Sequence, residues 1–171
     1  MSIEESFKAQ NYITYCPGNI FDYIPQNNTV VVLPHVMNNL GGWGAGFTRP
    51  LGKKYPHVQK AWREWFLTDK PQIGEVQCVK AEEDLYIMNM IAQESYKSLS
   101  NQRPLNYEYL YRCMSQVKNF VLNGQKNDSK PWEIHTVKFG AGLSGGSWRV
   151  IAAMIDDLWV ESDISTTVYV I

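Results

Sequence analysis

The sequence lacks several features that would point to particular classes of protein. Its 171 residues include only three cysteines, Cys16, Cys78 and Cys113, which are far apart and form neither a metal-binding spacing nor a disulfide framework. Such cysteines fit a reducing compartment. No apolar run approaches the length of a membrane span, and the polar, acidic segment 1–10 has no apolar stretch typical of a signal peptide. These absences predict a soluble cytoplasmic protein without a metal or another cofactor.

The sequence also has no marked charge of either sign. Sixteen Lys and Arg residues against seventeen Asp and Glu residues give a formal net charge of -1. This balance argues against bulk electrostatic binding to nucleic acid, although it leaves room for a local basic patch. Hydrophobic residues make up 44% and aromatic residues 13% of the chain, enough for one domain with a proper core. No repeat, low-complexity segment or linker divides it.

Strands and helices alternate in the secondary structure that the residue patterns predict. Strands are expected at 12–16, 29–34, on both sides of the turn 81–84 within 75–93, at 132–140 and at 166–171. Helices are expected at 105–124 and 148–162, with two short ones in 46–66 that break at Pro50 and Pro56. Alternation of this kind predicts an α/β domain with a largely parallel sheet covered on both faces.

Two glycine-rich loops follow predicted strands and lead into predicted helices. They are "NNLGGWGAG" (38–46) and "GAGLSGGSW" (140–148). Ligands bind outside the carboxyl ends of strands in open α/β sheets, and glycine-rich turns there bring backbone N–H groups close to an anion. The first loop lacks the Lys-Ser/Thr of a P-loop, and the first turn "PGN" is no dinucleotide fingerprint. Two interpretations remain. The two loops could hold a pyrophosphate between them, or the glycines could simply make tight connections between strands and helices.

The segments "PGNIF" (17–21), "HVMNNLGGWGAGF" (35–47), "KFGAGLSGGSW" (138–148), "AAMIDDLW" and the terminal "TVYVI" together resemble the macrodomain family. The resemblance is strongest to the branch of the ADP-ribose-1''-phosphate phosphatases and terminal ADP-ribose glycohydrolases, and it covers nearly the whole chain. It implies a single macrodomain over 1–171, a three-layer α/β/α sandwich with a mixed, largely parallel sheet. It also implies a monomer whose ligands are ADP-ribose, ADP-ribose-1''-phosphate and ADP-ribosylated macromolecules.

The resemblance also implies which residues bind the ligand. Gly18, Asn19 and Ile20 correspond to the adenine site, where Asn19 replaces the usual aspartate, and 140–147 to the loop around the diphosphate. Asn38 and Asn39 correspond to positions beside the distal ribose, where Asn38 is expected to fix the ribose or the phosphate. The full ligand-binding set is Gly18, Asn19, Ile20, Met37, Asn39, Gly44, Ala45, Gly46, Phe47, Ala92, Gln93, Phe139, Gly140, Ala141, Gly142, Leu143, Ser144, Gly145, Gly146, Ser147 and Trp148.

The sequence departs from the family at the positions that carry glycohydrolase chemistry. Where that branch has a lysine after the fourth strand and an aspartate in the second loop, this chain has Ala92–Gln93 and Ser144. The remaining catalytic candidates are His35 and Asn38. An imidazole can transfer a proton or position water at a phosphate monoester, although His35 is equally explained as a strand-end residue that caps a buried carbonyl. For His57 and His135 a structural role is favoured.

Further residues are expected at the margin of the site. Trp43 should anchor the first loop, and the polar segment 93–104 should run over the mouth of the site. Lys97 or Arg103 in this segment could pair with a terminal phosphate, or be an ordinary solvated charge. Packing is the expected role of Trp62, Trp65, Tyr107, Tyr109 and Tyr111.

These expectations favour hydrolysis of the terminal phosphate of ADP-ribose-1''-phosphate. Two alternatives are removal of ADP-ribose from protein or nucleic acid, and a non-catalytic module that reads or sequesters ADP-ribose.

Overall fold

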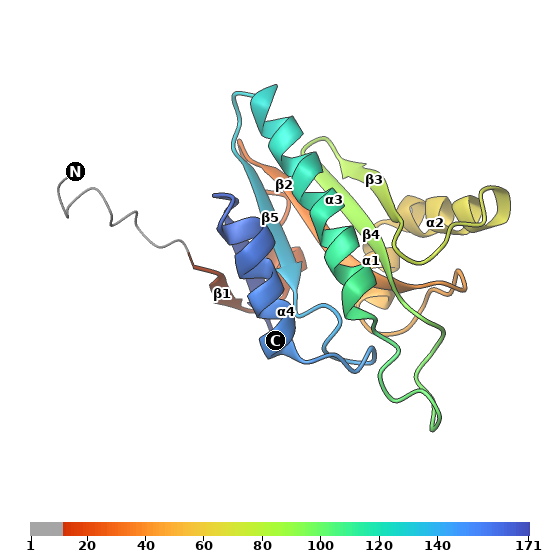
Figure 1. Ribbon diagram of the computed structural model, residues 1–171. Helices are drawn as coiled ribbons and strands as arrows, with labels where there is room; N and C mark the ends of the chain where they lie inside the picture. Colours follow the sequence, from red (N-terminus) through yellow and green to blue (C-terminus); the bar gives the residue numbers. More distant parts are fainter. Residues whose placement is uncertain (1–11) are drawn as a thin grey trace.

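A computed structural model describes residues 12–171, so the segment 1–10, for which no signal peptide is expected, lies outside the described residues. The chain forms one six-stranded sheet (Figure 1). Its strands are β1 (Thr14–Pro17), β2 (Val30–Asn38), β3 (Val76–Glu82), β4 (Leu85–Gln93), β5 (Trp132–Val137) and β6 (Thr166–Val170). They lie in the order β1-β6-β5-β2-β4-β3, and β3 is antiparallel to β4 while the other neighbouring pairs are parallel. The predicted mixed, largely parallel sheet is confirmed.

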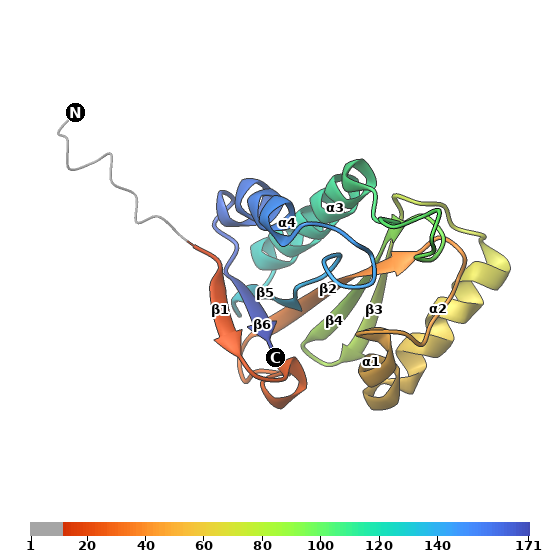
Figure 2. The same cartoon turned by 90° about the horizontal axis from the view of Figure 1, so that it is seen from below.

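Helices cover both faces of the sheet (Figures 1 and 2). The helices are α1 (Thr48–Lys54), α2 (Pro56–Thr68), α3 (Tyr107–Lys126) and α4 (Trp148–Ile155), with a 3-10 turn η2 (Ile20–Asp22) and a π-helical continuation η3 (Asp156–Val160). A large apolar core lies between the sheet and α3, α4 and η3, and two smaller clusters lie on the face of α1, α2 and η2. The three layers expected from the sequence are therefore present.

Side chains alternate along β2, so successive residues lie on opposite faces of the sheet. Val31 and Leu33 pack in the cluster beneath α1, whereas Val32 packs in the core beneath α3. Because successive side chains of a strand point to opposite faces, His35 points to the same face as Leu33. This face carries α1 and α2, and the first glycine loop crosses its edge.

β2 is longer than the sequence predicts, because Pro34 does not end it. The Pro34 carbonyl accepts a hydrogen bond from Thr136 Oγ1 at 2.6 Å, so this residue turns its carbonyl, and therefore also its nitrogen, toward β5. β5 pairs with β2 only at residues 30–32. No ladder hydrogen bond is lost at Pro34, and the strand continues to Asn38. The predicted strand at 132–140 is shorter, since β5 ends at Val137.

The expected break at Pro50 is also wrong, whereas the break at Pro56 is confirmed. α1 begins at Thr48, so Pro50 lies in its first turn. The N–H groups of that turn have no helical partner, and a proline there costs no hydrogen bond. Pro56 is the first residue of α2, after Tyr55 has left the helical conformation. Among residues 12–171, no helix combines the length and apolar character needed to cross a bilayer.

Candidate ligand-binding site

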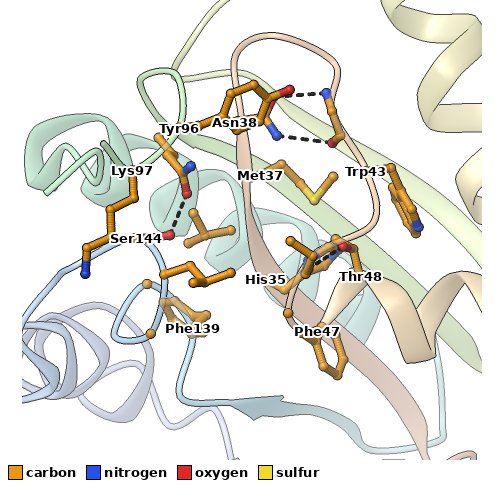
Figure 3. Close-up of a pocket in the computed structure, with 18 of the residues that line it drawn as sticks. His35, Met37, Asn38, Trp43, Phe47, Thr48, Tyr96, Lys97, Phe139 and Ser144 are labelled. Atoms are coloured by element: carbon orange, nitrogen blue, oxygen red, sulfur yellow. Dashed lines mark hydrogen bonds between the residues drawn. The ribbon is translucent and has the colours of Figure 1, made fainter. Parts of the chain in front are cut away.

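A cavity of about 600 Å³ opens at the carboxyl ends of β2, β4 and β5 (Figure 3). The two glycine loops and the start of the segment after β4 complete its wall. The lining residues are His35, Val36, Met37, Asn38, Gly42, Trp43, Gly44, Ala45, Gly46, Phe47, Thr48, Gln93, Tyr96, Lys97, Val137, Lys138, Phe139, Gly140, Gly142, Leu143 and Ser144. Its volume suits a small-molecule ligand, and its position is the usual one for ligands of parallel α/β sheets.

The first glycine loop, residues 38–46, is held in shape by the side chain of Asn38. Its Oδ1 accepts hydrogen bonds from the N–H groups of Leu40 at 2.9 Å and Gly42 at 3.0 Å, and its Nδ2 donates to the Gly42 carbonyl at 3.1 Å. The polar atoms of Asn38 are thus directed into the loop. This geometry gives Asn38 a loop-shaping role, which differs from the direct contact with the distal ribose or phosphate predicted from the sequence.

Two indole rings support this loop. Trp62 is fully buried, and its Nε1–H donates to the Gly41 carbonyl at 3.1 Å. Trp43 lies against Gly52 of α1, where an added Cβ would be 2.6 Å from the indole Nε1. The contact agrees with the anchoring role predicted for Trp43, and Trp62 is the packing residue that the sequence predicts.

The second glycine loop, residues 140–148, contains glycines of two kinds. At Gly146 an added Cβ would lie 2.4 Å from a methyl group of Leu105, so this glycine is needed for packing. At Gly142 an added Cβ would meet no atom within 4 Å, and the same holds at Gly44 in the first loop. Gly142 and Gly44 therefore border open space in the cavity, where a ligand can approach the backbone.

The second loop also presents backbone donors. Within residues 12–171, the N–H groups of Gly142, Leu143 and Ser144 have no protein acceptor, although those of Gly145 and Gly146 close the loop on itself. Successive unpaired N–H groups in a glycine-rich turn form a concave site for an anion. The cavity wall is correspondingly cationic, because its lining includes Lys97 and Lys138 and, among the described residues, no carboxylate.

A chain of amides fixes the orientation of the His35 ring. The Ala61 carbonyl of α2 accepts from Gln77 Nε2, so the Gln77 oxygen is left to accept from Asn89 Nδ2. Asn89 then turns its own oxygen to His35 Nε2, 2.5 Å away. Because an amide oxygen only accepts, Nε2 carries the proton and Nδ1 carries the lone pair.

The chemistry open to His35 follows from this tautomer and from burial. The ring is 2% exposed, and desolvation lowers its pKa from 6.5 to about 4, so it is neutral at pH 7. In residues 12–171, every side-chain nitrogen or oxygen that is shielded from solvent has a hydrogen-bond partner. Nδ1 of His35 has no such partner within the protein, so this atom is not shielded from solvent. Nδ1 therefore reaches solvent in the cavity that His35 lines. It can accept a hydrogen bond from water or a ligand hydroxyl.

Gln93 and Ser144 are in direct contact across the cavity wall. The Ser144 hydroxyl donates to Gln93 Oε1 at 2.6 Å, and Gln93 Nε2 donates to the Ser95 carbonyl at 2.8 Å. These are the two positions at which the glycohydrolase branch would have an aspartate and a lysine. The structure brings them together, but an amide and a hydroxyl can supply neither a lysyl adduct nor a carboxylate base.

Most of the predicted site residues line the cavity. Those that do are His35, Met37, Asn38, Gly44, Ala45, Gly46, Phe47, Gln93, Phe139, Gly140, Gly142, Leu143 and Ser144. The others lie outside its lining, namely Gly18, Asn19, Ile20, Asn39, Ala92, Ala141, Gly145, Gly146, Ser147 and Trp148. Ala92 faces the core beneath α3, and the Ser147 N–H donates to the Tyr107 hydroxyl at 2.7 Å. These two therefore support the wall from behind.

The turn expected to receive adenine lies next to the cavity. Asn19 Oδ1 accepts from the Phe21 N–H at 3.0 Å and caps η2, while Ile20 is buried. Phe21 stacks on Phe47, a lining residue, with ring centroids 5.5 Å apart. Adenine recognition by Asn19 stays a prediction, and Phe21–Phe47 is the structural connection between this turn and the cavity.

Several lining residues were not assigned to the ligand-binding set from the sequence. They are Val36, Gly42, Trp43, Thr48, Tyr96, Lys97, Val137 and Lys138. Gly42 belongs to the same glycine run as Gly44, and Lys138 precedes Phe139. Their position in sequence, next to predicted ligand-binding residues, could therefore have identified them as site residues. Tyr96 and Lys97 come from the polar segment that the sequence places over the mouth, and this expectation is confirmed.

His135 and Cys113 are buried and have structural surroundings. His135 is buried between Tyr169 and Glu133, each 2.8 Å from a ring nitrogen, as expected for a structural residue. Burial raises the pKa of the Cys113 thiol to about 12, so this thiol is not a reactive nucleophile at neutral pH.

Comparison with known proteins identifies the class. A macrodomain protein from Streptomyces coelicolor has a solved structure that is 28% identical in sequence, with a TM-score of 0.76, covering 93% of this chain and 99% of that chain. The chain therefore has the macrodomain fold that its sequence predicts. No family model matches it.

Two relatives of the chain are named for reactions of ADP-ribose compounds. The chain is 29% identical over 158 residues to the ADP-ribose glycohydrolase OARD1 of Homo sapiens, covering 92% of this chain and 90% of the relative. It is 22% identical over 163 residues to the ADP-ribose 1''-phosphate phosphatase of Lodderomyces elongisporus, covering 93% of this chain and 98% of the relative.

Proposed function

We propose that this protein binds ADP-ribose and its derivatives in the cavity and hydrolyses the terminal phosphate of ADP-ribose-1''-phosphate. The observation that carries the binding proposal is the second glycine loop, with open space at Gly142 and unpaired N–H groups at residues 142–144. Both curated relatives are named for ADP-ribose chemistry, and their similarity extends over nearly the whole chain. Lys97 and Lys138 add positive charge suited to a diphosphate.

The loops suit a diphosphate ligand in a specific way. Backbone N–H groups at 142–144 would bind the diphosphate oxygens, since they have no protein acceptor. The first glycine loop would follow the distal ribose, with Gly44 giving the ligand room to approach. Adenine would extend toward Phe47 and the Phe21 that stacks on it.

For hydrolysis, the reaction transfers a phosphoryl group to water and leaves ADP-ribose and inorganic phosphate. Catalysis of phosphoryl transfer depends mainly on positioning and charge stabilisation. His35 Nδ1 would accept a hydrogen bond from the attacking water and orient it, and its low basicity makes it a positioning group rather than a strong base. Asn38 would act indirectly, because its side chain shapes the loop.

A second candidate is binding without turnover, in which the protein reads or sequesters ADP-ribose. The specific observation in its favour is the absence of a carboxylate from the cavity lining in the described residues, together with the lowered pKa of His35. A third candidate function is removal of ADP-ribose from protein or nucleic acid, which is suggested by the name of the human relative, an ADP-ribose glycohydrolase. The Gln93–Ser144 pair counts against it, because neither residue is ionisable near neutral pH.

One experiment separates these candidates. The protein is mixed with ADP-ribose-1''-phosphate and, in parallel, with ADP-ribosylated protein and DNA, and release of phosphate and of ADP-ribose is followed. We expect phosphate release that is lost in His35→Ala and retained in His57→Ala, a matched histidine outside the cavity. Calorimetry with ADP-ribose confirms that His35→Ala still binds and is folded. Tight binding without release of either product would establish the non-catalytic function instead.

A further inference from the structure

A row of polar side chains crosses the face of the sheet that α1 and α2 cover. In the register of the neighbouring strands β2, β4 and β3 (Figure 1), His35 lies opposite Asn89, and Asn89 lies opposite Gln77. The preceding row on the same face is apolar, with Leu33 opposite Ile87. Asn89 is fully buried, and burial of an amide is unfavourable unless its polar atoms are hydrogen-bonded. An apolar side chain at residue 89 would suit this face better, so packing alone does not explain the row.

The hydrogen bonds along this row run in one direction, which is set outside the cavity. The Ala61 carbonyl of α2 can only accept, so Gln77 turns its nitrogen to α2 and its oxygen to the sheet. This oxygen accepts from Asn89 Nδ2 at 3.0 Å, and the Asn89 oxygen then faces His35. If Asn89 were reversed, its oxygen would face the Gln77 oxygen without a hydrogen between them. A backbone carbonyl of α2 therefore determines, through two amides, which nitrogen of His35 carries the proton.

The two amides act on the cavity only through His35. Neither Gln77 nor Asn89 lines the cavity, whereas His35 does. The rings of Phe47 and Trp43 contact the imidazole edge-on, with centroids 5.4 Å and 6.4 Å away. These rings restrict the plane of the imidazole, but they supply no strong acceptor that would choose between its neutral tautomers. Because amides do not titrate near neutral pH, the row keeps its direction there.

We propose that Gln77 and Asn89 are positioning residues for the hydrolysis, because together they keep the lone pair of His35 on the nitrogen that faces the cavity. This inference rests on the proposed function, in which Nδ1 accepts a hydrogen bond from the attacking water. With the opposite tautomer Nδ1 would carry the proton and could only donate, so it could not orient the water through a hydrogen of that water. An amide on the edge strand β3 thus controls a reaction whose substrate it does not touch.

Substitutions of Gln77 with different hydrogen-bonding ability test the direction of the row. Gln77→Lys places only donors beside Asn89 and the Ala61 carbonyl. The Asn89 oxygen should then turn to the lysine and its nitrogen to His35, so the proton should move to Nδ1. Gln77→Leu removes both donor and acceptor, and both tautomers should be present. Gln77→Glu still offers Asn89 an acceptor and should restore the original tautomer.

Nitrogen-15 NMR of the histidine rings measures the tautomer, because protonated and unprotonated ring nitrogens have well-separated chemical shifts. The chain has three histidines, and His35→Gln identifies the signals of His35. Phosphate release from ADP-ribose-1''-phosphate is measured on the same proteins. In Gln77→Lys we expect kcat to fall about 100-fold, the lower range for a positioned proton acceptor, while KM changes less than about twofold. Gln77→Leu should lie between this variant and the unmodified protein, and Gln77→Glu should recover kcat.

Gln116→Lys is the matched control. Gln116 also donates to a backbone carbonyl, that of Gly74 at 2.8 Å, but it belongs to α3 on the other face of the sheet. Its substitution should change neither the nitrogen shifts of His35 nor the kinetics. Melting temperatures establish that each variant is folded. If Gln77→Lys does not fold, the comparison of Gln77→Leu with Gln77→Glu decides the question.

Two results would overturn the positioning role. One is a His35 tautomer that is the same in the Lys, Leu and Glu variants of Gln77 as in the unmodified protein. The other is a reversed tautomer with an unchanged kcat. Absence of phosphate release from the unmodified protein would instead overturn the proposed function, and the nitrogen shifts would still decide whether Gln77 sets the tautomer.

Discussion

At the scale of single residues, asparagine side chains give the cavity its shape by binding backbone. Asn38 makes three hydrogen bonds within the first glycine loop, and Asn39 joins that loop to residue 95. Asn101 holds the segment 94–104 in the same manner. Asparagine is well suited to this because its short amide both donates and accepts near its own backbone. The groups that remain available to the proposed ligand are mainly backbone groups, two lysines and His35.

The buried His35 ring predicts a pH dependence of stability. Its pKa is about 4 in the folded protein and about 6.5 when the chain unfolds and the ring is solvated. Between these values the unfolded chain binds the additional proton, so stability is full above pH 6.5 and is lost as the pH falls toward 4. At about 1.4 kcal/mol per pKa unit, the loss attributable to His35 is roughly 3 kcal/mol at pH 4.

Urea unfolding of the protein and of His35→Gln at pH 7 and pH 4 measures this loss. Other groups also titrate in the window, so the relevant quantity is the difference between the two proteins at each pH. That difference should shift by roughly 3 kcal/mol in favour of the variant at pH 4. A difference that stays constant would mean that His35 takes up its proton in the folded protein as readily as in the unfolded chain, contrary to the lowering of its pKa by desolvation.

Gly142 offers a test of where the ligand lies. An added Cβ there meets open space, and the backbone does not require a positive φ, so substitution should leave the fold intact. Gly142→Glu would place a carboxylate beside the unpaired N–H groups and the expected diphosphate. We expect ADP-ribose binding to fall below detection by calorimetry, with an unchanged melting temperature. Gly142→Ala is the matched control and should bind within about threefold of the unmodified protein, since a methyl group costs little in open space.

At the scale of elements, the first glycine loop and Tyr96 meet at the mouth of the cavity. A methyl group at residue 42 would collide with the Tyr96 hydroxyl, and the tyrosine, which is 51% exposed, can swing away. Gly42→Ala should therefore leave stability almost unchanged and increase the dissociation rate of ADP-ribose several-fold, because Tyr96 no longer covers the site. Stopped-flow dissociation measures this rate.

A double-mutant cycle identifies the cause of that effect. In Tyr96→Ala the clash is absent, so adding Gly42→Ala to it should have little further effect, and the two changes should couple by at least about 0.5 kcal/mol. The same Cβ would also come within 3.1 Å of Asn38 Nδ2. Additive effects of the two substitutions would therefore point to distortion of Asn38 and not to displacement of Tyr96.

The elements themselves were largely predictable from the sequence, since their signals are local. The β-branched run at 29–34 and the four-residue spacing of apolar residues in 105–124 predict β2 and α3, whose Cys113, Val117 and Val121 are buried. Proline was the misleading signal. Pro34 lies in a central strand because the neighbouring strand has already left the ladder there, and this cannot be known before the strand order is known.

The site was predictable only in part, for the same reason. Glycine loops that follow parallel strands must meet at one edge of the sheet, so the position of the cavity could be derived. The partners of individual side chains could not. His35 depends on Asn89, and Ser144 contacts Gln93, each more than fifty positions apart in sequence. The hydrogen bond of Asn19 to its own turn likewise requires the backbone conformation.

At the scale of the whole molecule, the cavity connects parts of the chain that are distant in sequence. Its wall draws on β2, β4 and β5 and on loops from both sides of the central strands, and the helices on both faces hold these strands in place. A ligand that contacts both glycine loops therefore binds only the folded chain. Binding should stabilise the entire domain, not one loop.

Ligand-linked stability tests this connection. With ADP-ribose at 100 times its dissociation constant, mass action should add about 2.7 kcal/mol to the free energy of unfolding. For a chain of this size each kcal/mol raises the melting temperature by about 2–4 °C, so a rise of about 5–10 °C is expected by calorimetry or fluorescence. Gly142→Glu should show no rise, and ribose 5-phosphate, which lacks the diphosphate and adenine, should give less than about 1 °C. If the ligand raises the midpoint of a single cooperative unfolding transition, both loops belong to one folding unit. If the ligand affects only a minor, separate transition, the cavity forms independently of the core.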